Sequence, residues 1–252
     1  MPKGISEQEV FIVATDKKSI SGTLVRAEKT EGKMVIFVHG LFGDQHNHIF
    51  FNGAHALAKK GIDSYRFDFY SNKKNTRSFS QSSSLLQKTD LESVVKYFGK
   101  KYSDITIVAH SMGGYISLLW NEKHNKKYVK RFVLLDPSWE PTQIFSDLRF
   151  SQKFDFFIME DRIDTIIKKI YIDESKNLPS IAELAKKMKK PTLIIATEKG
   201  AKNIAKESYL ANIPCNQKDF IVLNTDHNFN DSKAETEVFN KIILWINKKH
   251  AN

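Results

Sequence analysis

The sequence has little cysteine and no long apolar run, and both features restrict the class of protein. Its 252 residues include one cysteine, Cys215, so no internal disulfide forms and a reducing, cytoplasmic location is expected. No apolar stretch approaches the roughly 18 residues of a transmembrane helix, which argues against an integral membrane segment. Residues 1–10 also lack the basic and apolar regions of a secretory signal.

Acidic residues are outnumbered by basic ones, and this imbalance raises the question of an anionic partner. The chain has 39 lysines and arginines against 29 aspartates and glutamates, a formal net charge of +10. The lysines are spread as doublets, most of them in loops or at predicted helix ends, where cations complement the helix dipole. The doublets are Lys59-Lys60, Lys73-Lys74, Lys100-Lys101, Lys126-Lys127, Lys168-Lys169, Lys189-Lys190 and Lys248-Lys249. Because no nucleic-acid-binding motif accompanies the charge, we predict no nucleic-acid partner.

Apolar segments rich in β-branched residues alternate with segments of helical period. The predicted strands are Val10–Ala14, Gly22–Val25, Met34–Val38, Asp63–Phe67, Ile105–Ala109, Arg131–Leu135, Thr192–Ala196 and Phe220–Leu223. The predicted helices are Ile49–Lys60, Leu85–Gly99, Gly113–Lys123 and Ala234–Lys248. Four of the strands are almost continuously apolar, as expected for strands buried on both faces of a parallel sheet. The alternation predicts one α/β domain over residues 1–252, with a mostly parallel central sheet covered by helices.

One segment, residues 139–190, interrupts this alternation. It is rich in phenylalanine and then in isoleucine at helical spacing, namely Phe145, Phe150, Phe154, Phe156, Phe157, Ile163, Ile166, Ile167 and Ile170. The spacing predicts a small helical insertion between two strands of the sheet. The insertion is either an ordinary packed segment or a cap, a lid over an apolar substrate pocket, and the two alternatives are compatible because a lid must also pack.

The segment Ala109-His110-Ser111-Met112-Gly113-Gly114 lies where a predicted strand meets a predicted helix. A serine flanked by small residues at such a turn is typical of a nucleophile elbow. The turn raises the serine hydroxyl above the sheet, and small neighbours leave room for the helix to approach the strands. The usual first glycine of the pattern is Ala109 here, a departure of one methyl group. We therefore predict that Ser111 is a nucleophile.

A serine nucleophile requires a base, a group that orients the base, and backbone donors for the oxyanion. The turn 39–43, His-Gly-Leu-Phe-Gly, follows a buried strand and directs the N–H of Leu41 toward the site. The second donor is the N–H of Met112, at the start of the following helix. Of the eight histidines, only His227 is both late in the chain and in a loop beyond a strand, so we predict it to be the base.

These residues make the chain resemble the α/β-hydrolase superfamily, and within it the serine esterases and lipases with a short cap. The resemblance rests on His39-Gly40, the elbow at Ser111, Asp90 in the helix before it, and the segment 226–229, and it covers nearly the whole chain. It implies an α/β-hydrolase fold, a nucleophile at Ser111 and a base at His227, with no cofactor and no metal. One departure is the loop after the fourth core strand, residues 68–73, which lacks the glycines of the family pattern.

A second departure concerns the acid that orients the base. The family often has an aspartate after the strand equivalent to Thr192–Ala196, where this chain has Gly200. Asp136, at the end of the preceding strand, is the favoured replacement, because some lipase branches carry their acid in a similar Leu-Asp-Pro context. Glu198 is the alternative acid, since it lies two residues before the usual position and has a longer reach. A different acid, or none, also remains open.

The residues and the resemblance together predict a serine hydrolase that cleaves carboxylic esters through an acyl-enzyme. The phenylalanine-rich insertion suggests a small-molecule ester with an apolar acyl or aryl group. A thioesterase or acyltransferase would use the same three side chains, and a non-catalytic binding protein on this scaffold is a further alternative. The sequence does not give the oligomeric state.

Overall fold

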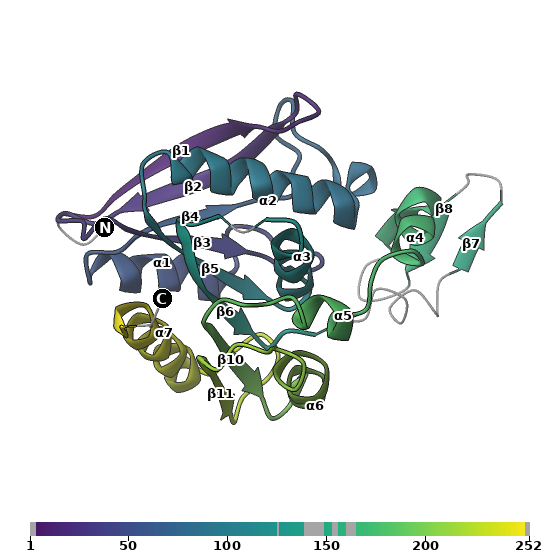
Figure 1. The fold of residues 1–252 in the computed structure, drawn as a ribbon. Coiled ribbons are helices and arrows are strands. Elements are labelled where there is room, and N and C mark those ends of the chain that lie inside the picture. Colours follow the sequence, from purple (N-terminus) through teal and green to yellow (C-terminus); the bar gives the residue numbers. More distant parts are fainter. Residues whose placement is uncertain (1–3, 125, 139–148, 153–155, 160–164, 250–252) are drawn as a thin grey trace.

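The computed structural model describes residues 4–124, 126–138, 149–152, 156–159 and 165–249. An eight-stranded sheet forms its centre (Figure 1). The strands of this sheet are β1 (Ser6–Val13), β2 (Ser19–Arg26), β3 (Lys33–Val38), β4 (Asp63–Phe67), β5 (Asp104–His110), β6 (Val129–Leu135), β10 (Thr192–Thr197) and β11 (Lys218–Leu223). All eight predicted strands are therefore confirmed, with ends displaced by a few residues.

The strand order is β1-β2-β4-β3-β5-β6-β10-β11. β1 and β2 pair antiparallel, as do β2 and β4, and every other pair is parallel. The carboxyl ends of the parallel strands consequently share one edge of the sheet. Ligand and catalytic sites of such α/β sheets lie outside that edge.

Helices cover both faces of the sheet. They are α1 (His48–Ala58), α2 (Ser84–Gly99), α3 (Met112–Asn121), α4 (Lys169–Ser175), α5 (Ile181–Ala185), α6 (Lys202–Ile204) and α7 (Ser232–Asn247), with the 3₁₀ turn η1 (Phe79–Gln81) and the π-helical η2 (Ala205–Leu210). α1 and α7 pack on one face, and α2, α3 and α5 pack on the other. None of the helices among the described residues is long and apolar enough to cross a bilayer.

The strand β3 shows why its sequence is continuously apolar. Val35 and Phe37 point into the core below α1 and α7, whereas Met34, Ile36 and Val38 point into the core below α2 and α3. All five side chains are buried. Because successive side chains of a strand alternate between faces, burial on both faces leaves no position for a polar residue.

The helices begin at polar capping residues. The side chain of Asn47 accepts a hydrogen bond from the Ile49 N–H at the start of α1, and Ser83 does the same for α2. Asp231 accepts from two amides at the start of α7. Each cap satisfies donors that have no partner inside the helix, which fixes where the helix begins.

The insertion differs from its prediction as a small helical segment. It contains three antiparallel strands, β7 (Arg149–Ser151), β8 (Phe156–Met159) and β9 (Thr165–Lys168), and α4 and α5 follow them. The helical interpretation of Ile166 and Ile167 is therefore wrong, since both belong to β9. A run of β-branched residues prefers an extended strand, and β8 supplies the partner. Residues 139–148, with Phe145, lie outside the described residues, as do Phe154 and Ile163.

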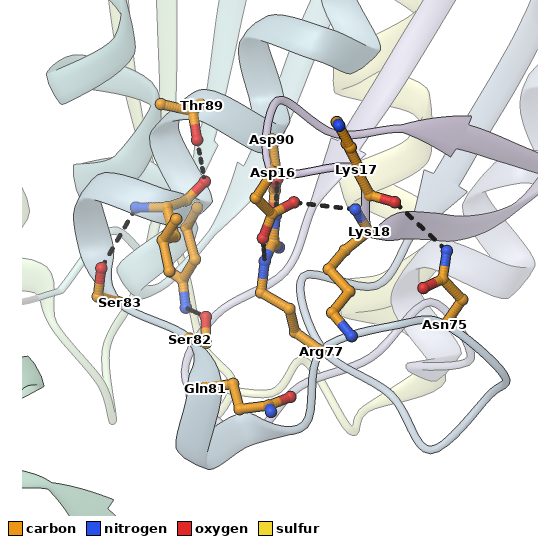
Figure 2. A network of polar contacts seen from close by, with 12 residues as sticks. Asp16, Lys17, Lys18, Asn75, Arg77, Gln81, Ser82, Ser83, Thr89 and Asp90 are labelled. Carbon is orange, nitrogen blue, oxygen red and sulfur yellow. Dashed lines mark hydrogen bonds and ion pairs between the residues drawn. The ribbon is translucent and has the colours of Figure 1, made fainter.

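The loop after β4, which lacks the family's glycines, is held by a buried arginine. The Arg77 guanidinium donates two hydrogen bonds to the Asp90 carboxylate on α2 and two to Asp16 in the β1–β2 turn. Figure 2 shows Arg77 reaching toward both carboxylates. Asp90 is fully buried and Arg77 nearly so. This network joins the loop, the hairpin and α2, so the shape of the loop is set by charge pairing.

Candidate active site

Ser111 occupies the tight turn between β5 and α3. Its backbone has φ 55° and ψ −126°, a left-handed conformation that is costly for any residue except glycine. Gly113 makes the turn possible, because a Cβ there would lie 2.4 Å from the Val38 carbonyl oxygen. Ala109 is buried within β5 and pairs with Val38 of β3, so its extra methyl group is accommodated by the core. The turn projects the Ser111 hydroxyl beyond the carboxyl edge of the sheet.

His227 lies in the loop between β11 and α7, and its ring contacts Ser111. Its Nε2 atom is 3.0 Å from Ser111 Oγ, and its Nδ1 atom is 2.5 Å from Asp136 Oδ2. The loop is anchored beside the ring, since Phe229 is fully buried and the ring of His110 contacts the His227 carbonyl oxygen at 2.9 Å. A carbonyl oxygen only accepts, so His110 Nε2 carries the proton in that contact.

Asp136 follows β6 directly and is fully buried. Its carboxylate accepts hydrogen bonds from the N–H of Thr197 at 2.8 Å and from the N–H of Ala201 at 3.0 Å. Burial by itself raises the pKa of Asp136, but the hydrogen bonds from His227, Ala201 and Thr197 outweigh it and hold that pKa below its usual value. An ionised carboxylate only accepts, so the Nδ1 atom of His227 carries a proton and, in the neutral ring, Nε2 accepts from the Ser111 hydroxyl.

Gly200 explains how a carboxylate from β6 reaches the histidine. A Cβ at this position would lie 2.2 Å from Asp136 Oδ2 and 2.2 Å from Thr197 Oγ1. The Asp136 carboxylate thus fills the space that a side chain at position 200 would need. The alternative acid, Glu198, is half-exposed and pairs with Lys202 at 2.5 Å. The structure brings Asp136 to His227 and leaves Glu198 on the surface.

The two amides predicted to bind an oxyanion flank Ser111. The turn 39–43 lies against the elbow, since a Cβ on Gly40 would be 2.9 Å from the Ser111 Cβ. Met112 is the first residue of α3, where amides have no partner within the helix. No described residue accepts a hydrogen bond from the N–H of Leu41 or of Met112. Within the described part of the chain, both donors are therefore available to a ligand.

His39 fixes this turn rather than taking part in proton transfer. Its Nε2 atom accepts a hydrogen bond from the Phe69 N–H at 3.0 Å, and its Nδ1 atom donates to the Gly40 carbonyl at 2.8 Å. Burial lowers the pKa of His39, against the opposing effect of the Gly40 carbonyl, so the ring is neutral. The side chain ties the turn after β3 to the loop after β4.

Ser138 is a site residue that the sequence did not reveal. Its Oγ atom lies 3.0 Å from Ser111 Oγ. Because the Ser111 proton points to His227, the Ser138 hydroxyl is the donor in this contact. Its only sequence signal is its position two residues after Asp136, at the end of a strand that reaches the site.

A group of aromatic side chains extends from the turn 39–43 to α4. The ring of Phe79 lies 5.0 Å from that of Phe42, 4.9 Å from that of Tyr70 and 6.4 Å from that of Tyr171. The Tyr171 hydroxyl contacts the sulfur of Met112 at 3.7 Å. These rings, which we call the aromatic group, place apolar surface between the insertion and the residue that follows Ser111.

The site offers no arrangement of metal ligands in the part of the chain that the structure describes. Nowhere among those residues do three or more histidine, cysteine, aspartate or glutamate side chains converge as ion ligands would. The chemistry available at the site is that of a hydroxyl, an imidazole, a buried carboxylate and two backbone amides.

Comparison with known proteins finds a matching family and solved structures with a similar fold. The family profile for the alpha/beta hydrolase fold matches residues 33–167. Among solved structures, alpha/beta hydrolase domain-containing protein 10 from mouse has a TM-score of 0.76 at 13% identity and covers 95% of this chain and 98% of its own. Est1E from Butyrivibrio proteoclasticus with bound ferulic acid has a TM-score of 0.74 at 18% identity, covering 93% and 98%. The esterase domain of a Rhodothermus marinus protein has a TM-score of 0.68 at 16% identity, covering 95% and 97%. No curated protein matches the sequence.

Proposed function

The chain belongs to the alpha/beta hydrolase fold family, and from this premise we propose that it is a serine hydrolase of carboxylic esters. The observation that carries the proposal is the continuous line of hydrogen bonds from Asp136 through His227 to Ser111. This arrangement supplies a nucleophile, its base and the group that orients the base. Esterases are among the solved structures with this fold, which supports the reaction class.

In the proposed reaction the Ser111 oxygen attacks the ester carbonyl carbon while His227 Nε2 takes its proton. The carbonyl electron pair moves onto the oxygen, and the tetrahedral intermediate then expels the alkoxide, which receives the proton from His227. An acyl-enzyme on Ser111 remains. Water attacks this ester in the second half, with His227 again acting first as base and then as acid. The products are the alcohol and the carboxylic acid.

The amides of Leu41 and Met112 are the proposed donors to the oxyanion. Their N–H groups face a charge that exists only after attack, so they stabilise the transition state more than the bound ester. The amino end of α3 adds its positive dipole beside the same position. Asp136 stays ionised through neutral pH and stabilises the imidazolium formed during each proton transfer.

The aromatic group supports an ester with an apolar acyl or aryl part as substrate. Phe42 is exposed, although its neighbours in the group are at least half-buried, so apolar surface remains open beside the turn 39–43. We expect kcat/KM for octanoyl and aryl esters of p-nitrophenol to exceed that for the acetyl ester. Equal values across the three esters would reject the apolar preference and leave the hydrolase assignment untouched.

Hydrolysis of p-nitrophenyl butyrate tests the reaction class. The Ser111→Ala variant should lose kcat by a factor on the order of 10⁶, as expected when the nucleophile of such a set is removed. Ser138→Ala, which removes a hydroxyl 3.0 Å away, is the matched control and should retain most of the activity. Wild-type protein without esterase activity, or a Ser111→Ala variant as active as wild type, would refute the proposal.

A further inference from the structure

The edge of the sheet opposite Ser111 carries a concentration of lysines that the sequence did not predict. Lys33 begins β3 and Val129 begins β6, whereas Ser111 and Asp136 follow the other ends of their strands. The amino ends of the parallel strands therefore form a second surface, remote from the candidate active site. In Figure 1 the insertion lies beyond one end of the sheet and the carboxyl end of α7 lies toward the other.

Three hollows along this surface share their basic residues. The largest measures about 960 Å³ and shares Lys127 and Lys130 with one neighbour and Lys189 and Lys190 with the other. The hollows thus form one continuous surface, which we call the basic edge. It comprises residues 33, 99–104, 121–124, 127–131, 186, 187, 189–191 and 246–249.

The basic edge holds thirteen lysines and arginines and two carboxylates, those of Asp104 and Glu122. This excess is as large as the net charge of +10 on the whole chain, so the rest of the molecule is close to neutral. Four of the seven lysine doublets contribute to this surface, namely Lys100-Lys101, Lys126-Lys127, Lys189-Lys190 and Lys248-Lys249, so the interpretation of the doublets as scattered is wrong for these four. Doublets far apart in the sequence meet because helix ends and connecting loops return to the same edge of a parallel sheet.

Few of these charges have an ion-pair partner among the described residues. The ion pairs are Arg131 with Asp104, Lys187 with Glu122, Lys248 with Asp219 and Lys33 with Glu31. Eight exposed lysines of the basic edge form no ion pair with any described residue, and Lys127, Lys130, Lys189 and Lys249 are among them. The helices α2, α3, α5 and α7 end here, and about half a negative charge at each helix end offsets only a small part of the excess.

We propose that the basic edge docks on the surface of an anionic phospholipid bilayer. Lysine dominates it, and lysine is a compact hydrated charge suited to diffuse attraction, whereas nucleic-acid recognition favours the arginine fork. The one arginine is held by Asp104 and Thr106. Tyr102 and Tyr128 do not offer stacking platforms for bases, because Tyr102 donates its hydroxyl to Asp63 and the Tyr128 ring packs closely against Gly99.

Two exposed apolar side chains border the basic edge. Leu244, on α7, is 67% exposed and lies one helical turn before Lys248. Tyr97, on α2, is exposed and holds the Lys101 ammonium 5.9 Å from its ring centre. Apolar and aromatic residues beside a lysine cluster enter the headgroup region of a bilayer while the charges stay at its surface. Docking in this orientation leaves Ser111 facing water.

Partitioning onto vesicles tests the proposal. Wild-type protein should bind vesicles of phosphatidylcholine with phosphatidylserine, and added salt should release it. The triple variant Lys127→Gln, Lys130→Gln, Lys189→Gln should bind about a hundredfold more weakly, since each lysine contributes about fivefold. The matched control is Lys74→Gln, Lys206→Gln, Lys233→Gln, which removes the same charge from exposed lysines on the Ser111 side and should keep wild-type binding. Leu244→Ala should weaken binding without changing charge.

Several results would overturn the docking surface. One is binding to vesicles of phosphatidylcholine alone that is as tight as binding to the anionic vesicles. Another is a loss of binding in the control triple variant as large as that in Lys127→Gln, Lys130→Gln, Lys189→Gln. A third is tighter binding to a duplex DNA than to the anionic vesicles. Loss of hydrolysis of a soluble ester on bound vesicles would contradict the orientation. The Ser111→Ala variant should bind vesicles as wild type does, so this test stands or fails independently of the proposed hydrolase.

Discussion

At the scale of single residues, the candidate site depends on one carboxylate that approaches from an adjacent strand. Asp136 is buried and bonded to two backbone amides, so its position against His227 is fixed before any substrate binds. Gly200 leaves the space that this carboxylate occupies. A preorganised partner of this kind holds the imidazole in one tautomer and stabilises its charged form.

Exchange of the carboxylate for an amide tests its role. Asp136→Asn should lower kcat by a factor on the order of 10⁴, because the amide donates to Nδ1 and forces the wrong tautomer. Glu198→Gln is the matched control, and it should leave kcat unchanged because Glu198 pairs with Lys202 on the surface. Ester hydrolysis by the two purified variants distinguishes the carboxylates, and the reverse pattern would reassign the acid.

The sequence predicted Ser111 and His227 from local pattern, but it could not decide between Asp136 and Glu198. A nucleophile elbow is a short-range feature, since the tight turn needs small residues within a few positions. The choice of acid depends on the space beside residue 200, which is created by contact between β6 and β10. Ser138 was missed for the same reason, because its contact with Ser111 spans 27 residues.

His110 is a buried titratable residue whose effect is on stability. Burial, followed by the nearby charge of His227, lowers its pKa to about 4, against about 6.5 in an unfolded chain. Between these pH values the unfolded chain binds more protons, so the free energy of unfolding decreases as the pH falls from about 6.5 to about 4. The loss amounts to at most about 3 kcal/mol.

Urea denaturation across that pH range measures this contribution. His110→Gln keeps a donor for the His227 carbonyl and should show a shallower loss of stability on acidification than wild type. His46→Gln, at an exposed position, is the control and should follow the wild-type slope. If His110→Gln loses stability as steeply as wild type, another group carries the pH dependence.

At the scale of elements, strands and long helices were predictable and the insertion was not. A strand buried on both faces leaves a continuous apolar run, as β3 and β6 do. In the insertion the isoleucines at positions 166 and 167 fit helical spacing and strand preference equally. The pairing of β9 with β8 decides between them, and that pairing is a tertiary contact.

The ion pairs of Arg77 connect three separate segments, namely the loop after β4, the β1–β2 hairpin and α2. Arg77→Met should lower the free energy of unfolding by about 3–5 kcal/mol, because it leaves the Asp90 carboxylate buried without its partner. Urea denaturation provides the measurement. The double variant Arg77→Met, Asp90→Leu should recover much of the loss, since it removes the uncompensated charge as well.

Lys73→Ala is the control for that pair of variants. It breaks an exposed ion pair with Glu9 and should cost less than about 1 kcal/mol. If Arg77→Met is no more destabilising than Lys73→Ala, the buried network does not hold these elements together.

At the scale of the whole molecule, the parallel sheet separates two surfaces. Its carboxyl edge gathers Ser111, Asp136 and His227, and its amino edge gathers the lysines of the basic edge. Neither set of residues is clustered in the sequence, because the strand order of the sheet brings each set together. Hydrolysis and docking would then act at opposite ends of one rigid sheet.

The nucleophilic character of Ser111 is the central claim, and a fluorophosphonate probe tests it most directly. Mass spectrometry of the labelled protein should find one phosphonyl adduct, on the peptide that contains Ser111. The adduct should be absent from Ser111→Ala and should form far more slowly on His227→Ala, which lacks the base. Wild-type protein that takes no label, or a Ser111→Ala variant that is labelled at Ser138, would contradict the account.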